Sequence, residues 1–177
     1  KVFGIVISVC VGIALGGQPI VGFNCGAGNF GRVKETYKKI MLACSAVGLA
    51  ATAVFQLLPD LIVDLFGRGN SEIYIEYARL CLRIYLVTVL LTCLIKASSI
   101  FLQSMGASFK SMAISVARDV VFFVPAITVL GLCTGSVKYM LWAAAVTDIL
   151  TGILTFVFVR GEFKKLDKLN NLPVDNV

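Results

Sequence analysis

The stretch GGQPIVGFNCGAGNFGRVKE, residues 16–35, contains six glycines, a proline and the amides of Gln18 and Asn24. It continues an apolar run that carries no charge from Val2 to Gly31. A bilayer core needs roughly 20 mostly apolar residues per helix, so this run is long enough to span a membrane. Helix breakers and amides are costly there, because hydrocarbon leaves polar groups unpaired. The stretch therefore predicts a membrane helix with a polar or conformational role.

The rest of the chain has the same character. Of its 177 residues, 58% are hydrophobic and 15% are charged, and the mean hydropathy of +0.91 lies outside the usual range of soluble domains. No apolar segment alternates with period two, which favours helices over a membrane barrel. We predict an all-α membrane protein whose partner is the lipid bilayer. Its five spans are expected at about 2–29, 40–66, 82–105, 111–133 and 138–160.

Basic residues follow the first, third and fifth segments, whereas mixed or sparse charges follow the second and fourth. By the positive-inside rule, the N-terminus lies outside and the C-terminus is cytoplasmic. The net charge of +6 is then explained by topology, not by nucleic acid binding. Residues 1–162 are predicted to form a transmembrane lobe. Residues 163–177 are predicted to be a cytoplasmic tail that begins as a frayed helical extension and is solvated. Because the apolar run begins directly after Lys1, we expect the chain to be a piece of a longer protein.

Several classes of function are disfavoured by what the sequence lacks. The six cysteines form no C-x-x-C pair, and the chain has no histidine to complete a zinc site. No nucleophile motif is present either. We therefore expect no enzyme, no metal site and no cofactor.

Small residues recur at every fourth position of the first segment, which indicates a bare helix face suited to close helix packing. They are Gly4, Ser8, Gly12 and Gly16, followed by Gly22 and Gly26. Pro19 removes a backbone donor, so a kink or local unwinding is predicted near it. Packing explains the glycines but not Gln18 and Asn24. These amides favour a bent helix that lines a cavity over packing alone.

Two ionisable residues lie near the middle of predicted spans, where such residues are functional candidates. Lys96 belongs to a polar stripe on the third segment, made of Tyr85, Thr88, Thr92, Lys96, Ser99 and Gln103. Asp148 lies in the fifth segment beside Thr147, Thr151 and Thr155. We predict that Lys96 and Asp148 pair across helices. Snorkelling of Lys96 and a structural hydrogen bond of Asp148 are the alternatives. For Arg118 and Asp119, an interfacial salt bridge is expected.

The run G-x-x-x-G-G-Q-P-I-V-G-F-N-C-G-A-G-N-F-G-R-V-K-E resembles a segment of the multidrug and toxic compound extrusion (MATE) transporters. Within this family of the MOP superfamily, it is most similar to the bacterial branch of MepA-like and DinF-like proteins. Four later stretches share the likeness: LLPDLIVDLFG (57–67), FLQSMGASFKS (101–111), ARDVVFFVPAITVLG (117–131) and VTDILTGILT (146–155). Two positions depart from the family pattern. Similar proteins often have an aromatic residue at the position of Cys25 and an amide residue at the position of Asp119. The resemblance implies helices 8 to 12 of a twelve-helix exporter, with the N-terminal lobe missing.

The resemblance also implies a function: secondary active efflux of organic cations, coupled to H⁺ or Na⁺ by alternating access in the bacterial inner membrane. The expected pathway residues are Asp148, Lys96, Gln18, Asn24, Gln103 and Thr92. Conformational or packing roles are expected for Pro19, Gly12, Gly16, Gly26, Pro125 and Arg118. Two alternatives stay open, a lipid-linked oligosaccharide flippase of the same superfamily and a non-transporting membrane scaffold subunit.

Overall fold

The computed structural model describes residues 2–57, 88–134 and 142–170, which form five helical rods and no strand. The fourth rod is continuous through three helical segments, α6, η1 and α7. Four of the described rods are long and apolar enough to cross a membrane, and the prediction of an all-α membrane protein is confirmed. The elements are α1 (Val2–Gly26), α2 (Phe30–Leu57), α5 (Val89–Ser104), α6 (Ser108–Val116), η1 (Ala117–Phe123), α7 (Val124–Thr134) and α9 (Trp142–Asn170).

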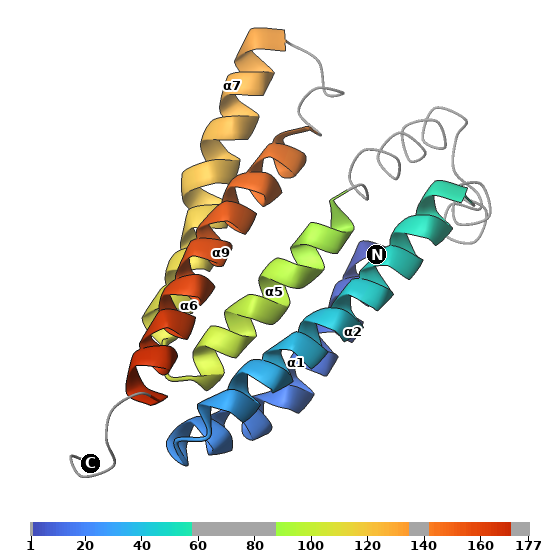
Figure 1. The fold of residues 1–177 in the computed structure, drawn as a ribbon. Coiled ribbons are helices and arrows are strands. Elements are labelled where there is room, and N and C mark those ends of the chain that lie inside the picture. The colour runs from blue at the N-terminus through green and yellow to red at the C-terminus, as the bar shows by residue number, and fades with distance from the viewer. Residues whose placement is uncertain (1, 58–87, 135–141, 171–177) are drawn as a thin grey trace.

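Helix α5 is the central rod. It packs against α1 and α2 on one side and against α6 and α9 on the other (Figure 1). Two tight turns, α1–α2 and α5–α6, lie at the same end of the molecule as the C-terminal end of α9 (Figure 1). Each turn contains a glycine with positive φ, Gly28 at 71° and Gly106 at 80°. A side chain would strain the backbone there, so these glycines allow the chain to reverse sharply.

Helix α2 begins at Phe30, ten residues before the predicted start near residue 40. The basic residues that follow α1 therefore lie on the first turns of α2 and not in a loop. No proline interrupts residues 30–39, and Lys39 forms an i,i+4 ion pair with Glu35 at 2.8 Å, which supports helix in water. Predicted helix ends within 58–87 and 135–141, together with Tyr85, lie outside the described residues.

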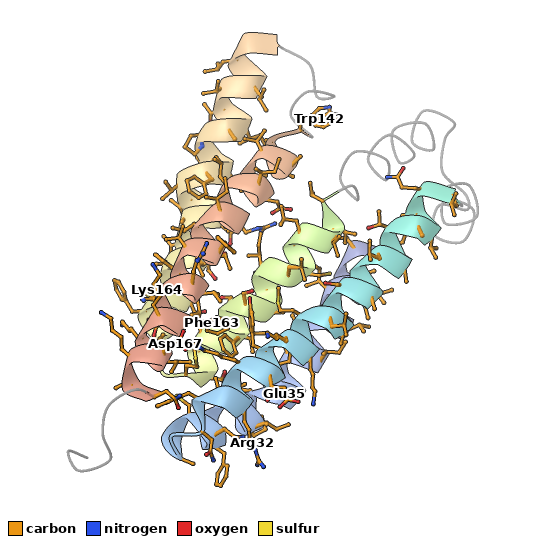
Figure 2. The ribbon with its side chains drawn as sticks, in the orientation of Figure 1. Arg32, Glu35, Trp142, Phe163, Lys164 and Asp167 are labelled. Atoms are coloured by element: carbon orange, nitrogen blue, oxygen red, sulfur yellow. The ribbon has the colours of Figure 1, made fainter. Side chains whose placement is uncertain are left out.

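Helix α9 continues to Asn170, past the predicted end near residue 160. The ring of Phe163 packs edge-on against Tyr37 (centroids 5.3 Å apart) and Phe101 (5.9 Å), and Leu166 is buried in the same cluster. Phe163 lies on the side of α9 that faces α2 and α5, whereas Lys164 lies on the outer side (Figure 2). The predicted helical extension is therefore present over residues 163–170, but it is packed rather than frayed and solvated, because apolar side chains are buried there. Residues 171–177 lie outside the described part.

Ion pairs reinforce this packing at the same end of the molecule. Lys34 of α2 pairs with Asp167, and Lys110 of α6 pairs with Glu162. Both acidic residues belong to α9, so its last turns are tied to two other rods. The carboxylate of Asp167 is 63% exposed, so the Lys34–Asp167 pair contributes only up to about 1 kcal/mol. Glu162 is 12% exposed, so its pair with Lys110 is partly buried.

The rod α6–η1–α7 contains a π-helical segment, Ala117–Phe123, two residues before Pro125. Proline cannot donate a backbone hydrogen bond, and its ring clashes with the carbonyl four residues earlier. A wider helical turn relieves that clash, and local π adjustments are a known response to proline in membrane helices. Short π-helical stretches also occur frequently at functional sites. This segment carries Arg118.

The glycine face predicted on α1 packs against the described helices only in part. Gly12, Gly16 and Gly26 have open space where a side chain would project. The close contacts are made instead by Gly17, against Ile40, and by Gly22, against the carbonyl of Ser104. The reason is that Gly17 and Gly22 lie on the side of α1 that α2 and α5 cover. Gly12, Gly16 and Gly26 therefore have no close neighbour among the described residues, and their conformational or packing role stays a prediction.

Pro19 does not interrupt α1, which is α-helical from Val2 to Gly26. The predicted unwinding at Pro19 is therefore wrong. The carbonyl of Leu15 still lacks its usual helical donor, because proline has no N–H. A bend of α1 at this position stays a prediction.

One glycine of α2 supports a stability prediction. A β-carbon at Gly48 would lie 2.8 Å from Cδ1 and 3.1 Å from Cα of Leu90. Gly48→Ala is expected to lower the free energy of unfolding by about 1–3 kcal/mol, since the backbones of α2 and α5 must separate. Gly161→Ala is the matched control: its site on α9 is open, and higher helix propensity should raise stability by up to about 1 kcal/mol. Thermal unfolding in detergent measures both, and equal effects would contradict this packing.

Candidate functional site

A buried carboxylate joins three rods in the interior. Asp148 of α9 is 2% exposed. Its Oδ1 accepts a hydrogen bond from Nε of Arg118 at 3.0 Å and forms an ion pair with Nη2 of Arg118 at 2.9 Å. Its Oδ2 accepts a hydrogen bond from Oγ1 of Thr92, at 2.5 Å. This group, called the Asp148 cluster below, connects α9 with η1 and α5.

Arg118 is shared between two carboxylates. Its Nη1 lies 3.1 Å from Oδ1 of Asp119, the next residue on η1. The side chain of Asp119 is 62% exposed, while that of Arg118 is 19% exposed. One guanidinium therefore serves a buried and an exposed carboxylate, and with both ionised the three groups carry a formal charge of −1. The planar fork of arginine is suited to holding two acceptors at once.

The buried part of this cluster is sensitive to the loss of either charge. Removing one partner of a buried ion pair typically costs about 3–5 kcal/mol, because the other charge stays uncompensated. A proton on Asp148 would likewise weaken its charge-assisted bonds to Arg118. The arrangement is chemically able to change the attachment of α9 to η1 when Asp148 gains or loses charge.

Local structure explains why Asp148 is held from several sides. Oγ1 of Thr92 lies 3.2 Å from the backbone oxygen of Thr88, one turn earlier on α5, so its hydroxyl is positioned on this face. On α9, Thr151 donates to the carbonyl of Thr147 at 2.7 Å. The hydroxyl of Thr147 itself is buried and has no partner among the described residues. A hydroxyl without a partner therefore lies next in sequence to the buried carboxylate.

The predicted pairing of Lys96 with Asp148 is wrong, because Arg118 occupies that position. Lys96 is half-buried on α5, one helical turn from Thr92, and forms no ion pair with any described residue. An arginine from the facing η1 segment presents two donors to one oxygen, which a single ammonium does not. The expected salt bridge between Arg118 and Asp119 is present, although Arg118 also binds Asp148. Thr92 is brought to Asp148 as part of the same cluster.

Gln103 belongs to a separate polar cluster between α5 and α6. Its Nε2 donates to Oγ of Ser111 at 2.9 Å, and that oxygen lies 2.7 Å from Oγ of Ser99. Ser99 and Ser111 are buried, whereas Gln103 is exposed near the α5–α6 turn. The predicted polar stripe of α5 therefore forms two separate sets of hydrogen bonds, one with Ser111 of α6 and one with Asp148 of α9.

The amides of α1 are not brought to the Asp148 cluster by any hydrogen bond among the described residues. Asn24 is 7% exposed, and its Nδ2 donates to the carbonyl of Ile20 at 2.8 Å. Its Oδ1 is buried without a partner in this part of the chain. Gln18 is half-buried, and its side chain forms no hydrogen bond with another described residue. A cavity-lining role of both amides stays a prediction.

Comparison with known proteins assigns the family. The MatE family model matches residues 1–128, which is most of the chain. The chain belongs to the MatE family. This MatE chain is also similar to a solved structure described as the inward-facing conformation of a multidrug resistance MATE family transporter of the MOP superfamily. The TM-score is 0.86 at 20% sequence identity, over 94% of this chain and 38% of the solved chain. A search of curated proteins found no match.

The resemblance noted in the sequence is thus confirmed at the level of the family. The solved structure, at 20% identity, supports the fold alone. The MatE chain spans 38% of that transporter's length, so it corresponds to less than half of such a protein.

Sequence reasoning missed two features of the site in this MatE chain. It did not assign Arg118 to Asp148, and it did not assign Ser111 to the polar face of α5. The signal for Arg118 was present, since an arginine within an apolar span needs a buried partner. A serine within a span gives no comparable signal. Among the described residues, no group of three histidine, cysteine or acidic side chains gathers as a metal site.

Proposed function

We propose that this MatE chain forms part of a secondary active multidrug exporter, in which cation entry through H⁺ or Na⁺ antiport drives efflux of organic cations by alternating access. The supporting observation is the buried Asp148 cluster, with a 2.9 Å contact between Asp148 and Arg118. Ionisable groups within a membrane interior are costly, and they commonly mark ion or substrate pathways. The multidrug transporter of similar fold adds support for the class of activity.

The proposed coupling acts through the attachment of α9. While Asp148 is ionised, its bonds to Arg118 and Thr92 favour the conformation in which α5, η1 and α9 are joined. A proton on Asp148, or a sodium ion beside it, competes with Arg118 for the carboxylate. The ion therefore binds better to a conformation in which this attachment is loosened. Such differential binding is the requirement for an ion to shift a conformational equilibrium.

The charge of the site fits cationic substrates. Arg118 with its two carboxylates leaves a formal charge of −1, and Asp119 is the exposed member. A pyrophosphate carried by a lipid-linked oligosaccharide flippase would meet repulsion there. Lys96 forms no ion pair with a described residue, and its positive charge is the feature that favours a flippase, since it would attract pyrophosphate. A scaffold subunit has no need for a charge at this depth.

Other parts of the proposal follow from the exporter mechanism. Transport requires a second helical lobe beside this one, as in transporters that rock around a central site. We propose that this lobe belongs to the same polypeptide. The proposed location is the bacterial inner membrane, with the end formed by the α1–α2 turn and the last turns of α9 in the cytoplasm. No cofactor is proposed beyond the coupling ion.

Proteoliposomes that contain the complete transporter test this proposal. Ethidium accumulation is measured under an imposed pH gradient, an imposed sodium gradient and no gradient. The proposal predicts accumulation with one of the two gradients and none without. Accumulation that is equal in all three conditions would contradict antiport. Exchange of a lipid-linked oligosaccharide without ethidium movement would favour the flippase, and movement of neither would favour the scaffold.

A further inference from the structure

A pocket of about 170 Å³ lies between α2, α5 and α9, beside the Asp148 cluster: Leu91 precedes Thr92, and Gly152 lies one turn after Asp148. Residues from one face of α5 and one face of α9 oppose each other across it, at spacings of three and four. Two residues of α2 close a third side. None of the lining residues described is charged. They are Tyr37, Met41, Leu91, Leu94, Ile95, Ser98, Gly152, Thr155, Phe156 and Val159.

Small side chains at the contact between α5 and α9 explain the space. Gly152 approaches Leu91 so closely that a β-carbon would lie 3.1 Å from Cδ1 of Leu91. Beyond this contact, Ser98 and Thr155 occupy less volume than the leucines around them. Phe156 is 61% exposed, so its ring lies at the rim and not in the floor. The two helices therefore touch at Gly152 and leave a ring-sized gap next to it.

The polar groups of the pocket are unequal. The hydroxyls of Tyr37 and Ser98 lie 2.9 Å apart, and Ser98 also donates to the sulfur of Met41 at 3.6 Å. Thr155 is 4% exposed, and its hydroxyl has no partner among the described residues. Thr151, one turn earlier on α9, does return its hydroxyl to the carbonyl of Thr147. Thr155 is thus a buried hydroxyl with both donor and acceptor capacity left unused, a state that usually costs free energy.

We propose that this pocket binds a neutral aromatic ring that carries one hydrogen-bonding group, a phenol or aryl alcohol, and that its entry turns the hydroxyl of Thr155, buried in the empty pocket, toward that group. The volume fits one ring, since an apolar cavity of about 150 Å³ holds a benzene molecule. The walls are apolar and aromatic, and the absence of charge among the described lining residues favours a neutral group. A plain alkyl chain would leave Thr155 unsatisfied.

The test uses the purified complete transporter in lipid nanodiscs, with empty nanodiscs to subtract partitioning into lipid. Fluorine NMR measures the dissociation constants of 4-fluorophenol and fluorobenzene, two probes that differ by one hydroxyl. The wild-type protein is expected to bind the phenol about threefold to tenfold more tightly than fluorobenzene, the range of one net hydrogen bond. In Thr155→Val the dissociation constants of the two probes should become about equal, while that of fluorobenzene is unchanged.

Two further variants locate the site. Thr151→Val removes a hydroxyl that is already bonded within α9, and the phenol preference should stay intact. Gly152→Leu fills the pocket, so the saturable binding of both probes should be lost. If Gly152→Leu fails to fold, Thr155→Val still decides, because it removes an unsatisfied buried hydroxyl and is expected to fold at least as stably as the wild type.

Absence of saturable binding to the wild-type protein, or an unchanged phenol preference in Thr155→Val, would overturn the proposal. Adding ethidium identifies the source of the ring. Displacement of 4-fluorophenol assigns the pocket to an aromatic portion of an exported compound, and retention assigns it to a separate small phenol. Both results support the site.

Discussion

Replacement of Asp148 with asparagine in the complete transporter is expected to lower the rate of ethidium efflux at least about tenfold, the effect of a change of ~1.4 kcal/mol in a barrier. Asparagine keeps the shape of the side chain but cannot carry the charge that attracts Arg118 or the coupling ion. The guanidinium, 19% exposed, would lose its buried partner. The measurement is ethidium efflux from energised cells of a strain that lacks its own exporters, normalised to the amount of protein in the membrane.

Asp119→Asn is the matched control for Asp148→Asn. It neutralises the second carboxylate bound to Arg118, on a side chain that is 62% exposed. Exposed ion pairs contribute about 0–1 kcal/mol, so a much smaller loss of efflux is expected. Equal losses in the two variants would contradict the distinction between the buried and the exposed partner. Unchanged efflux in Asp148→Asn would remove Asp148 from the pathway.

Truncation of Phe163 to alanine should lower the free energy of unfolding by about 2–3 kcal/mol, somewhat below the 3–5 kcal/mol of a fully buried aromatic. The ring of Phe163 makes edge contacts with Tyr37 and Phe101, and its loss leaves a gap where α9 meets α2 and α5. The effect is measured by chemical unfolding of the purified protein in detergent.

Leu169→Ala serves as the control for Phe163→Ala, because Leu169 lies on the same turns of α9 but is 51% exposed. Substitutions of this kind usually change stability by less than about 0.5 kcal/mol. If both variants unfolded like the wild type, the last turns of α9 would contribute no packing. The solvated tail predicted from the sequence would then be the better description.

The positions of the rods were predictable because a membrane span needs a long uninterrupted apolar run. The ends of the rods were not. Charged residues such as Lys34 and Asp167 suggest that a span has finished, yet a helix can continue into water when its next turns are packed. That packing depends on Phe163 meeting Tyr37, residues more than a hundred positions apart. No local pattern reports such a contact.

The site was predictable in its chemistry and less so in its geometry. Asp148 and Thr92 stood out because polar side chains are rare in spans, and the structure joins them directly. Lys96 was paired with Asp148 on depth alone. Depth leaves rotation about the helix axis undetermined, and the π-helical segment before Pro125 rotates the residues of that rod further. The partner is therefore Arg118, a residue whose sequence neighbour Asp119 had already offered a simpler explanation.

Asp148 is proposed to take up the coupling ion when Arg118 is released. Release of that ion on binding of drug tests this proposal. The complete transporter is purified in weakly buffered detergent, and a pH-sensitive dye or a sodium-selective electrode follows the addition of ethidium. The wild-type protein is expected to release H⁺ or Na⁺, and the Asp148→Asn variant is expected to release neither. Release of the same amount by Asp148→Asn, with ethidium still bound, would contradict the proposal.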